Sequence, residues 1–333
     1  MCALYAALRA RQGAGATWGA AVAFAVVLVL AGLVVLAWCA DQLVVGAARI
    51  AERLGLSPAF VGVVVVGIGT SLPELAVSGF AAGRGETGLA VGNLVGSKIL
   101  NVTLVLGLVG VIAPVVAEPR VVRTLGPLSV GAVGLFAVLV GGGLGRSEGT
   151  VLATLLVLAL LAQLRTARLG GPSIMAVPVV GEQASLVRES LRTAVGLLGT
   201  LGGAQLLVGN ATVIADRMGV SQAVIGFTLV ALGTSLPELV TSLQAHRRGA
   251  SELLVGNLLG SNLVNSLAGG ATIALATPAT AAGKVPGVGG SVLTAMTLTG
   301  VLAWMLLAGG RLNRGGALVL LAVCAVVLPL LTG

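Results

Sequence analysis

The heptapeptide GTSLPEL occurs twice in the chain, beginning at Gly69 and at Gly233. In each copy a threonine and a glutamate stand four residues apart, so a hydroxyl and a carboxylate share one face of a helix. The proline between them removes a backbone donor and crowds the preceding turn, which predicts a broken helix with freed carbonyl groups. Such oxygens are the ligands of a hard cation. The side chains concerned are Thr70, Ser71, Glu74, Thr234, Ser235 and Glu238.

A second duplicated pattern follows each heptapeptide and places polar residues four positions apart, so that they form one stripe on a helix. Two glycines with the same spacing accompany each stripe and should let a neighbouring helix approach closely. The stripes either hold helices together by hydrogen bonds alone or complete an oxygen-lined site. They comprise Asn93, Ser97 and Asn101 beside Gly92 and Gly96, and Asn257, Ser261 and Asn265 beside Gly256 and Gly260.

The composition places these polar motifs in a membrane. Of 333 residues, 57% are hydrophobic and only 9% are charged, whereas about a quarter are charged in soluble domains. Despite a net charge of +8, aromatic residues make up 3%, which argues against nucleic-acid binding. His246 is the only histidine and the three cysteines have no metal-binding spacing, so the sequence predicts no cofactor and no enzyme.

Apolar stretches that could cross the membrane need about 20 helical residues, and polar or Gly/Pro-rich segments divide the chain into ten. Basic residues in the connections number twelve on one face and six on the other, and the richer face should be cytoplasmic. We therefore expect both termini outside a cell membrane. The predicted spans are 20–46, 58–83, 88–112, 124–143, 149–165, 190–211, 222–246, 252–276, 288–309 and 314–332.

An internal repeat organises these spans. A shift of 164 residues aligns 61–81 with 225–245 at 11 of 21 positions, and 89–101 with 253–265 at 8 of 13. Five spans separate the copies, so the second should cross the membrane in the opposite direction, as in inverted-repeat transporters. The predicted organisation is a short tail (1–17), a first membrane repeat (18–165), a cytoplasmic linker (166–189) and a second repeat (190–333).

Charged residues away from the heptapeptides call for separate interpretations. Lys98 lies within the third span, where the second copy has Asn262. Its ammonium should face an aqueous crevice or pair with Glu74, or occupy charge space that a monovalent cation would otherwise use, which would make it a residue that modulates specificity. Asp41 should be interfacial or line an access path. The remaining acids should lie in solvated connections or at span ends, namely Glu52, Glu86, Glu118, Glu148, Glu182, Glu189, Asp216 and Glu252.

Together the two GTSLPEL heptapeptides, followed by GNLVGSKILN and GNLLGSNLVN, resemble the cation/Ca2+ antiporter superfamily, specifically its prokaryotic sodium/calcium exchanger members. The resemblance implies an all-α membrane protein with ten helices in two inverted five-helix repeats, in which helices 2 and 7 are broken at proline. It implies ion sites between helices 2, 3, 7 and 8. Its site residues are Glu74 and Glu238, with Thr70, Ser71, Thr234, Ser235, Ser97, Ser261, Asn101 and Asn265, and carbonyls near Gly67 and Ala231.

This sequence departs from the family pattern in two ways. Several members carry aspartate at the position of Asn101 or Asn265, whereas both are neutral here, and the first GSN triplet reads GSK. We expect an antiporter that exchanges Ca2+ for Na+ by alternating access, its first and sixth helices sliding across the others. Alternatives are an H+-coupled Ca2+/cation antiporter and a passive cation channel. Its partners should be cations and the lipid bilayer, and the sequence leaves the oligomeric state open.

Overall fold

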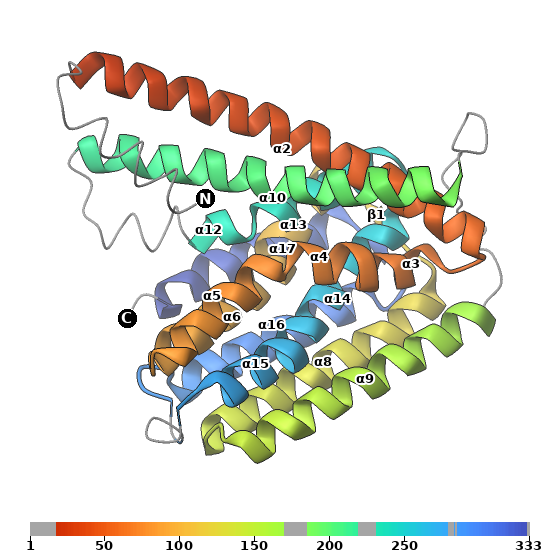
Figure 1. Ribbon diagram of the computed structural model, residues 1–333. Helices are drawn as coiled ribbons and strands as arrows, with labels where there is room; N and C mark the ends of the chain where they lie inside the picture. Colours follow the sequence, from red (N-terminus) through yellow and green to blue (C-terminus); the bar gives the residue numbers. More distant parts are fainter. Residues whose placement is uncertain (1–17, 170–184, 219–230, 279–282, 284, 332–333) are drawn as a thin grey trace.

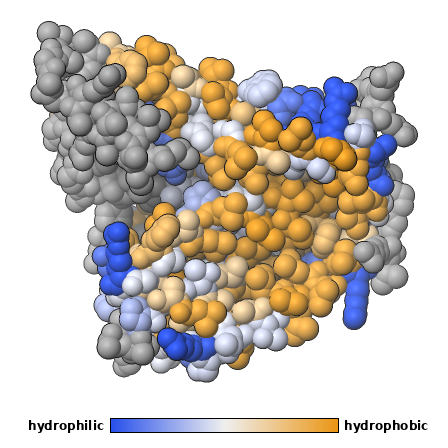
Figure 2. All heavy atoms as spheres, viewed as in Figure 1, coloured by the Kyte–Doolittle hydropathy of each residue, from blue (hydrophilic) through white to orange (hydrophobic). Residues whose placement is uncertain are grey.

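The computed structural model describes residues 18–169, 185–218, 231–278, 283 and 285–331, and these residues are mostly α-helical. The predicted tail lies outside them, as do most of the linker and the first part of the predicted span 222–246. Seven described helices are long and apolar enough to cross a membrane, or eight if the bent pair Pro58–Thr70 and Leu72–Gly83 is one span. A broad hydrophobic surface is bordered by hydrophilic residues (Figure 2). These features confirm a helical membrane protein.

Two long helices, α2 (Trp18–Leu54) and α10 (Leu186–Arg217), lie side by side across one face of the helical bundle (Figure 1). Their backbones meet at glycines, because a Cβ added to Gly196 would lie 2.5 Å from the Leu43 nitrogen. The packing is that of small-residue interfaces in membranes. Glycines on both helices therefore set how closely this pair approaches.

Both long helices extend beyond the predicted spans. α2 continues to Leu54, where the predicted span ends at 46, so Glu52 lies on a helix rather than in a connection. No helix-breaking residue intervenes before Gly55, whose φ of +60° ends the helix. α10 begins at Leu186, within the predicted linker. Glu189 is consequently helical and buried, which corrects its expected place in a solvated connection.

The second predicted span consists of α3 (Pro58–Val61), the π-helix η1 (Gly62–Gly67), α4 (Ile68–Thr70) and α5 (Leu72–Gly83). The Ser57 hydroxyl caps its start by accepting from the Phe60 N–H at 3.3 Å, and Pro58 fits the first turn. The two halves meet at an angle of 47° around Ser71, with a proline in the first turn of α5. The predicted break in this helix is confirmed.

The repeat in the sequence is a repeat in the structure. Following α5 come α6 (Thr87–Leu100), π-helix η2 (Asn101–Val105) and α7 (Leu106–Ile112). All four elements recur 164 residues later as α13 (Leu236–Arg247), α14 (Ser251–Val264), η4 (Asn265–Gly269) and α15 (Gly270–Ala276). α12 (Ala231–Thr234) ends one residue before α13. The helix in the second copy is therefore interrupted at Ser235, the position that matches Ser71.

Four further helices complete the bundle, namely α8 (Pro119–Gly142), α9 (Arg146–Leu169), α16 (Gly290–Leu307) and α17 (Arg314–Val327), followed by the 3-10 helix η6 (Leu328–Leu331). A short antiparallel pair, β1 (Val115–Val116) with β2 (Arg311–Leu312), joins the connections that precede α8 and α17. α8 and α9 lie on the side opposite α2 and α10 (Figure 1). The broken helices and both polar stripes lie between these two pairs of helices (Figure 1).

Candidate cation site

Two fully buried carboxylates stand at the helix breaks. Glu74 is in the first turn of α5 and Glu238 in the first turn of α13, and neither is exposed. The first turn of a helix favours negative charge. The two carboxylates are close enough to interact electrostatically. The Thr70 and Ser71 hydroxyls lie beside the Glu238 carboxylate without forming hydrogen bonds of good geometry to it. The first copy thereby contributes to the surroundings of the second copy's carboxylate.

The first polar stripe faces the α5 half of the broken helix. The Ser97 hydroxyl donates to Glu74 Oε1 at 3.5 Å. Asn93 Nδ2 donates to the Glu74 carbonyl at 3.2 Å and to Ser78 Oγ at 3.0 Å. These bonds fix α5 against α6 and hold the Glu74 backbone in place. The structure therefore brings Glu74 and Ser97 together, as the sequence predicts.

The second stripe contacts both copies. Asn257 Nδ2 donates to Ser242 Oγ at 3.2 Å, which mirrors the bond between Asn93 and Ser78. The Thr70 hydroxyl of the first copy donates to Asn257 Oδ1 at 3.4 Å. Ser261 donates to the Gly67 carbonyl at 3.3 Å. α14 therefore links the first half of the broken helix to α13, and the predicted positions Gly67 and Ser261 meet.

Glycines allow this close approach on one side. A Cβ on Gly256 would overlap the Ala59 carbonyl, and one on Gly260 would lie 2.8 Å from the Val63 Cα. The predicted role of the second glycine pair is confirmed. No described atom lies within 4 Å of a Cβ added to Gly92 or Gly96. The structure thus gives that pair no close partner in the part of the chain it describes.

Among the described residues, several buried polar atoms of the site have no hydrogen-bond partner. A carboxylate held away from water without a partner is costly, and a bound cation would supply the missing partner. Oxygen predominates among these atoms, which suits a hard cation such as Ca2+. The unpartnered atoms are Ser71 Oγ, Glu74 Oε2, Asn101 Oδ1, Ser235 Oγ, both Glu238 oxygens, and Nδ2 and Oδ1 of Asn265.

Two predicted positions are less well defined. Thr234 is partly buried at the end of α12 and adjoins Ser235. Ala231 is the first residue of α12, and the chain before it lies outside the described residues, so the structure does not test its carbonyl as a ligand. Within the described ranges no three His, Cys, Asp or Glu side chains form a metal-binding group. The two glutamates therefore supply the carboxylates of this site.

The position of Lys98 corrects both interpretations that placed its ammonium near water or near Glu74. The residue is 1% exposed, and its Nζ has no hydrogen-bond partner within the described ranges. Nζ instead lies 3.8 Å from the centroid of the Phe136 ring on α8. A cation over an aromatic face is stabilised by the ring quadrupole. Lys98 points away from the stripe because successive helical residues are turned by about 100°.

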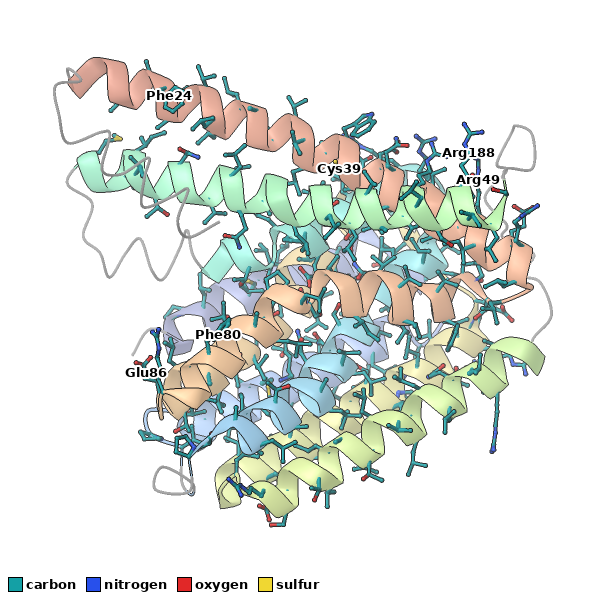
Figure 3. All side chains as sticks on the ribbon, viewed as in Figure 1. Phe24, Cys39, Arg49, Phe80, Glu86 and Arg188 are labelled. Carbon is teal, nitrogen blue, oxygen red and sulfur yellow. The ribbon has the colours of Figure 1, made fainter. Side chains whose placement is uncertain are left out.

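Two ionic contacts of α2 were not predicted from the sequence. The buried Glu189 of α10 accepts from Arg49 at 2.8 Å, so the pair joins the two long helices. Arg49 and Arg188 lie at one end of the two long helices α2 and α10, while Glu86 lies at the opposite end of the molecule (Figure 3). Asp41, predicted to be interfacial or to line a path, receives two hydrogen bonds from Arg248, at 2.8 and 2.7 Å. No spacing rule links these residues, because the partners are far apart in sequence.

The chain matches a known protein family over most of its length. The family model described as sodium/calcium exchanger protein matches residues 24–165 and 191–333. The inner membrane protein YrbG of Escherichia coli is 36% identical over 248 residues, covering 72% of this chain and 76% of YrbG. The sodium/calcium exchanger MaX1 of Methanosarcina acetivorans is 27% identical over 276 residues, covering 72% of this chain and 79% of MaX1.

A solved structure of the sodium-calcium exchanger NCX_Mj, soaked with Na+ and Sr2+, superposes with a TM-score of 0.81 and 30% sequence identity. The match covers 92% of this chain and 99% of that one. Its likeness extends over both copies of the repeat, and the family model also matches both. The chain belongs to the sodium/calcium exchanger protein family.

Proposed function

We propose that this protein is a secondary active antiporter that exchanges Ca2+ for Na+ by alternating access across the cell membrane. The observation that carries this proposal is the pair of buried carboxylates at matched helix breaks, surrounded by oxygens without partners. Two carboxylates balance one divalent ion, and the same oxygens can hold Na+ when Ca2+ has left. Competition between the ions for one site couples their movements.

The architecture that we propose is ten helices in two inverted halves. The second half repeats four consecutive elements of the first with a constant shift. Family matches at 24–165 and 191–333 support repeats at 18–165 and 190–333. By the basic-residue count, both termini face outward and the 166–189 linker is cytoplasmic. Ion sites near the midplane between repeats follow from this arrangement.

Either Na+ or H+ could be the ion whose gradient drives Ca2+ exchange. Na+ is favoured because MaX1 and NCX_Mj are named as sodium/calcium exchangers. Neutral Asn101 and Asn265 provide the specific argument for H+, because two protons on Glu74 and Glu238 would balance one departing Ca2+ without a further acid. Both mechanisms use the same two carboxylates, and they differ in the gradient that drives uptake.

Transport assays in proteoliposomes test the proposal. Purified protein is reconstituted, and uptake of radiolabelled 45Ca2+ is measured under an outward Na+ gradient or an outward H+ gradient, with the membrane potential clamped. We expect uptake with the Na+ gradient. Uptake with the H+ gradient alone would establish the alternative, and no uptake under either gradient would refute exchange.

The positive charge of Lys98 should affect how many monovalent ions the site binds. We propose that its positive charge, held in the core one residue from Ser97, discourages one additional Na+. Replacing Lys98 by methionine keeps the length of the side chain and removes the charge. We expect a steeper dependence of 45Ca2+ uptake on Na+ concentration, with the Hill coefficient rising by roughly one for each extra ion. An unchanged Hill coefficient would show that Lys98 does not influence the number of Na+ ions that bind.

The ion pair between Asp41 and Arg248 should bias the conformational equilibrium, because it ties α2 to the end of α13. A partly exposed pair is worth about 1 kcal/mol or less, so Asp41→Asn should shift state populations up to roughly fivefold. We expect the KM for Ca2+ on one side to change by a similar factor. The charge exchange Asp41→Arg with Arg248→Asp should restore it.

Arg84 provides a matched control for this pair. It occupies the position 164 residues before Arg248, and no ion pair in the described part of the chain involves it. Arg84→Gln should therefore leave the KM unchanged on both sides. Equal effects of Arg84→Gln and Arg248→Gln would show that general surface charge, rather than the contact with α2, is responsible.

A further inference from the structure

The two copies of the repeat differ at one position beside the site. The triplet GSK ends at Lys98, and its counterpart GSN ends at Asn262. Both side chains are buried, at 1% and 2% exposure. Each follows the stripe serine directly and precedes the stripe asparagine by three residues. The difference therefore falls between two residues of the candidate site in each copy.

In the second copy, the Asn262 side chain takes part in two hydrogen bonds to residues of the first copy. Asn262 Nδ2 donates to the Lys98 backbone carbonyl at 3.2 Å. A carbonyl can only accept, so this bond fixes the orientation of the Asn262 amide. Asn262 Oδ1 is then the atom that accepts from Asn101 Nδ2, at 3.4 Å. As a result, the Asn101 side chain is held through Nδ2, while its Oδ1 has no hydrogen-bond partner among the residues that the structure describes.

The mirror-related pair of hydrogen bonds is absent from the described residues. A counterpart would need a side-chain acceptor at position 98 to receive the Asn265 N–H, and lysine offers only donors. The Lys98 ammonium lies over Phe136 instead. Asn265 is fully buried, and neither polar atom of its side-chain amide has a hydrogen-bond partner in the described part of the chain. The two stripe asparagines thus occupy matching positions, but only one is held.

We propose that Asn262 is a positioning residue that holds Asn101 with its oxygen directed to the transported cation, and that Lys98 leaves Asn265 without this support. This inference rests on the proposed cation site and specifies its asymmetry. A ligand that is already oriented loses less rotational freedom when the ion binds. Asn101 Oδ1 therefore contributes more to cation affinity than Asn265 Oδ1, although the sequence motifs treat them alike.

The test compares alanine substitutions in different backgrounds, using 45Ca2+ binding to the detergent-solubilised full chain. In the wild-type background, Asn101→Ala should weaken binding by roughly tenfold and Asn265→Ala by roughly twofold, since an immobilised side chain costs about a tenfold factor. Asn262→Leu keeps the volume but not the hydrogen bonds. In that background, Asn101→Ala should have a smaller effect, close to that of Asn265→Ala.

A gain of function separates positioning from a loss of folding. Lys98→Asn supplies the missing acceptor, so it should tighten 45Ca2+ binding, and Asn265→Ala should then weaken binding by roughly tenfold. Lys98→Met removes the charge without adding an acceptor and should leave the effect of Asn265→Ala at roughly twofold. Equal effects of the two alanine substitutions in the wild type, or equal behaviour of Lys98→Asn and Lys98→Met, would overturn the inference. Wild-type protein that binds no 45Ca2+ would instead refute the proposed function.

Discussion

Replacing Glu238 by glutamine should abolish Ca2+ transport, with a loss of at least about a hundredfold. Glu238 is fully buried, and neither of its carboxylate oxygens has a hydrogen-bond partner among the described residues. Glutamine preserves the shape but leaves a divalent ion with one carboxylate. Removing one partner of a buried charge pair costs about 3–5 kcal/mol, which corresponds to this loss. Glu74→Gln should have an effect of the same order, because Glu74 occupies the matching position.

The same substitution should leave the fold intact or stabilise it. In the absence of ions, the two charged carboxylates repel each other, and three of their four oxygens lack a hydrogen-bond partner among the described residues, so a neutral amide removes this repulsion. We expect an equal or higher melting temperature in Ca2+-free detergent, and a smaller rise on adding Ca2+. Glu86→Gln is the matched control, because Glu86 is exposed and precedes α6. It should transport normally, whereas near-wild-type exchange in Glu238→Gln would exclude Glu238 from the site.

The local features of the site could be predicted because the repeat preserves them. Proline beside a threonine and a glutamate predicts a helix break with oxygen ligands next to it. The structure has such a break at Ser71 and at Ser235. Four-residue spacing likewise predicts that Asn93 and Ser97 share a face, and both contact Glu74. These predictions depend on separations of a few residues, where helix geometry leaves little freedom.

Features that depend on tertiary packing could not be predicted in this way. Lys98 is paired with an aromatic ring on α8, and no periodicity identifies Phe136 as its neighbour. The sequence places Glu189 in the predicted linker. In the structure α10 already begins at Leu186, so Glu189 is helical and is buried against Arg49. The π-helical segments that begin at Asn101 and Asn265 also have no simple sequence signal. Such segments often occur at functional sites, and here both coincide with the end of a polar stripe.

Gly256→Ala should disrupt transport by separating the two elements that form the site. The added Cβ would overlap the Ala59 carbonyl, which belongs to the helix preceding η1. Gly62 faces α14 in the same way, since its Cβ would lie 2.6 Å from the Leu253 carbonyl oxygen. Neither contact is with a flexible side chain, so the backbones must move apart. Overpacking of this kind costs about 1–3 kcal/mol.

The separation acts on the site because Asn257 follows Gly256 directly. Its contact with Thr70 is already 3.4 Å long, and the Ser261 contact with the Gly67 carbonyl is 3.3 Å. A shift of well under 1 Å removes both bonds. We therefore expect Gly256→Ala to lower the melting temperature and to reduce 45Ca2+ exchange by at least about tenfold, since small misplacements of ligands are costly.

Gly131→Ala separates this effect from the general cost of changing a helical glycine. Gly131 lies within α8, and no described atom is within 4 Å of a Cβ placed there. Alanine is the better helix former by about 1 kcal/mol, so Gly131→Ala should raise the melting temperature slightly and leave exchange unchanged. If Gly256→Ala behaved in the same way, the interface between α14 and η1 would be able to accommodate an added methyl group. The position of Asn257 would then not depend on close packing of the two backbones.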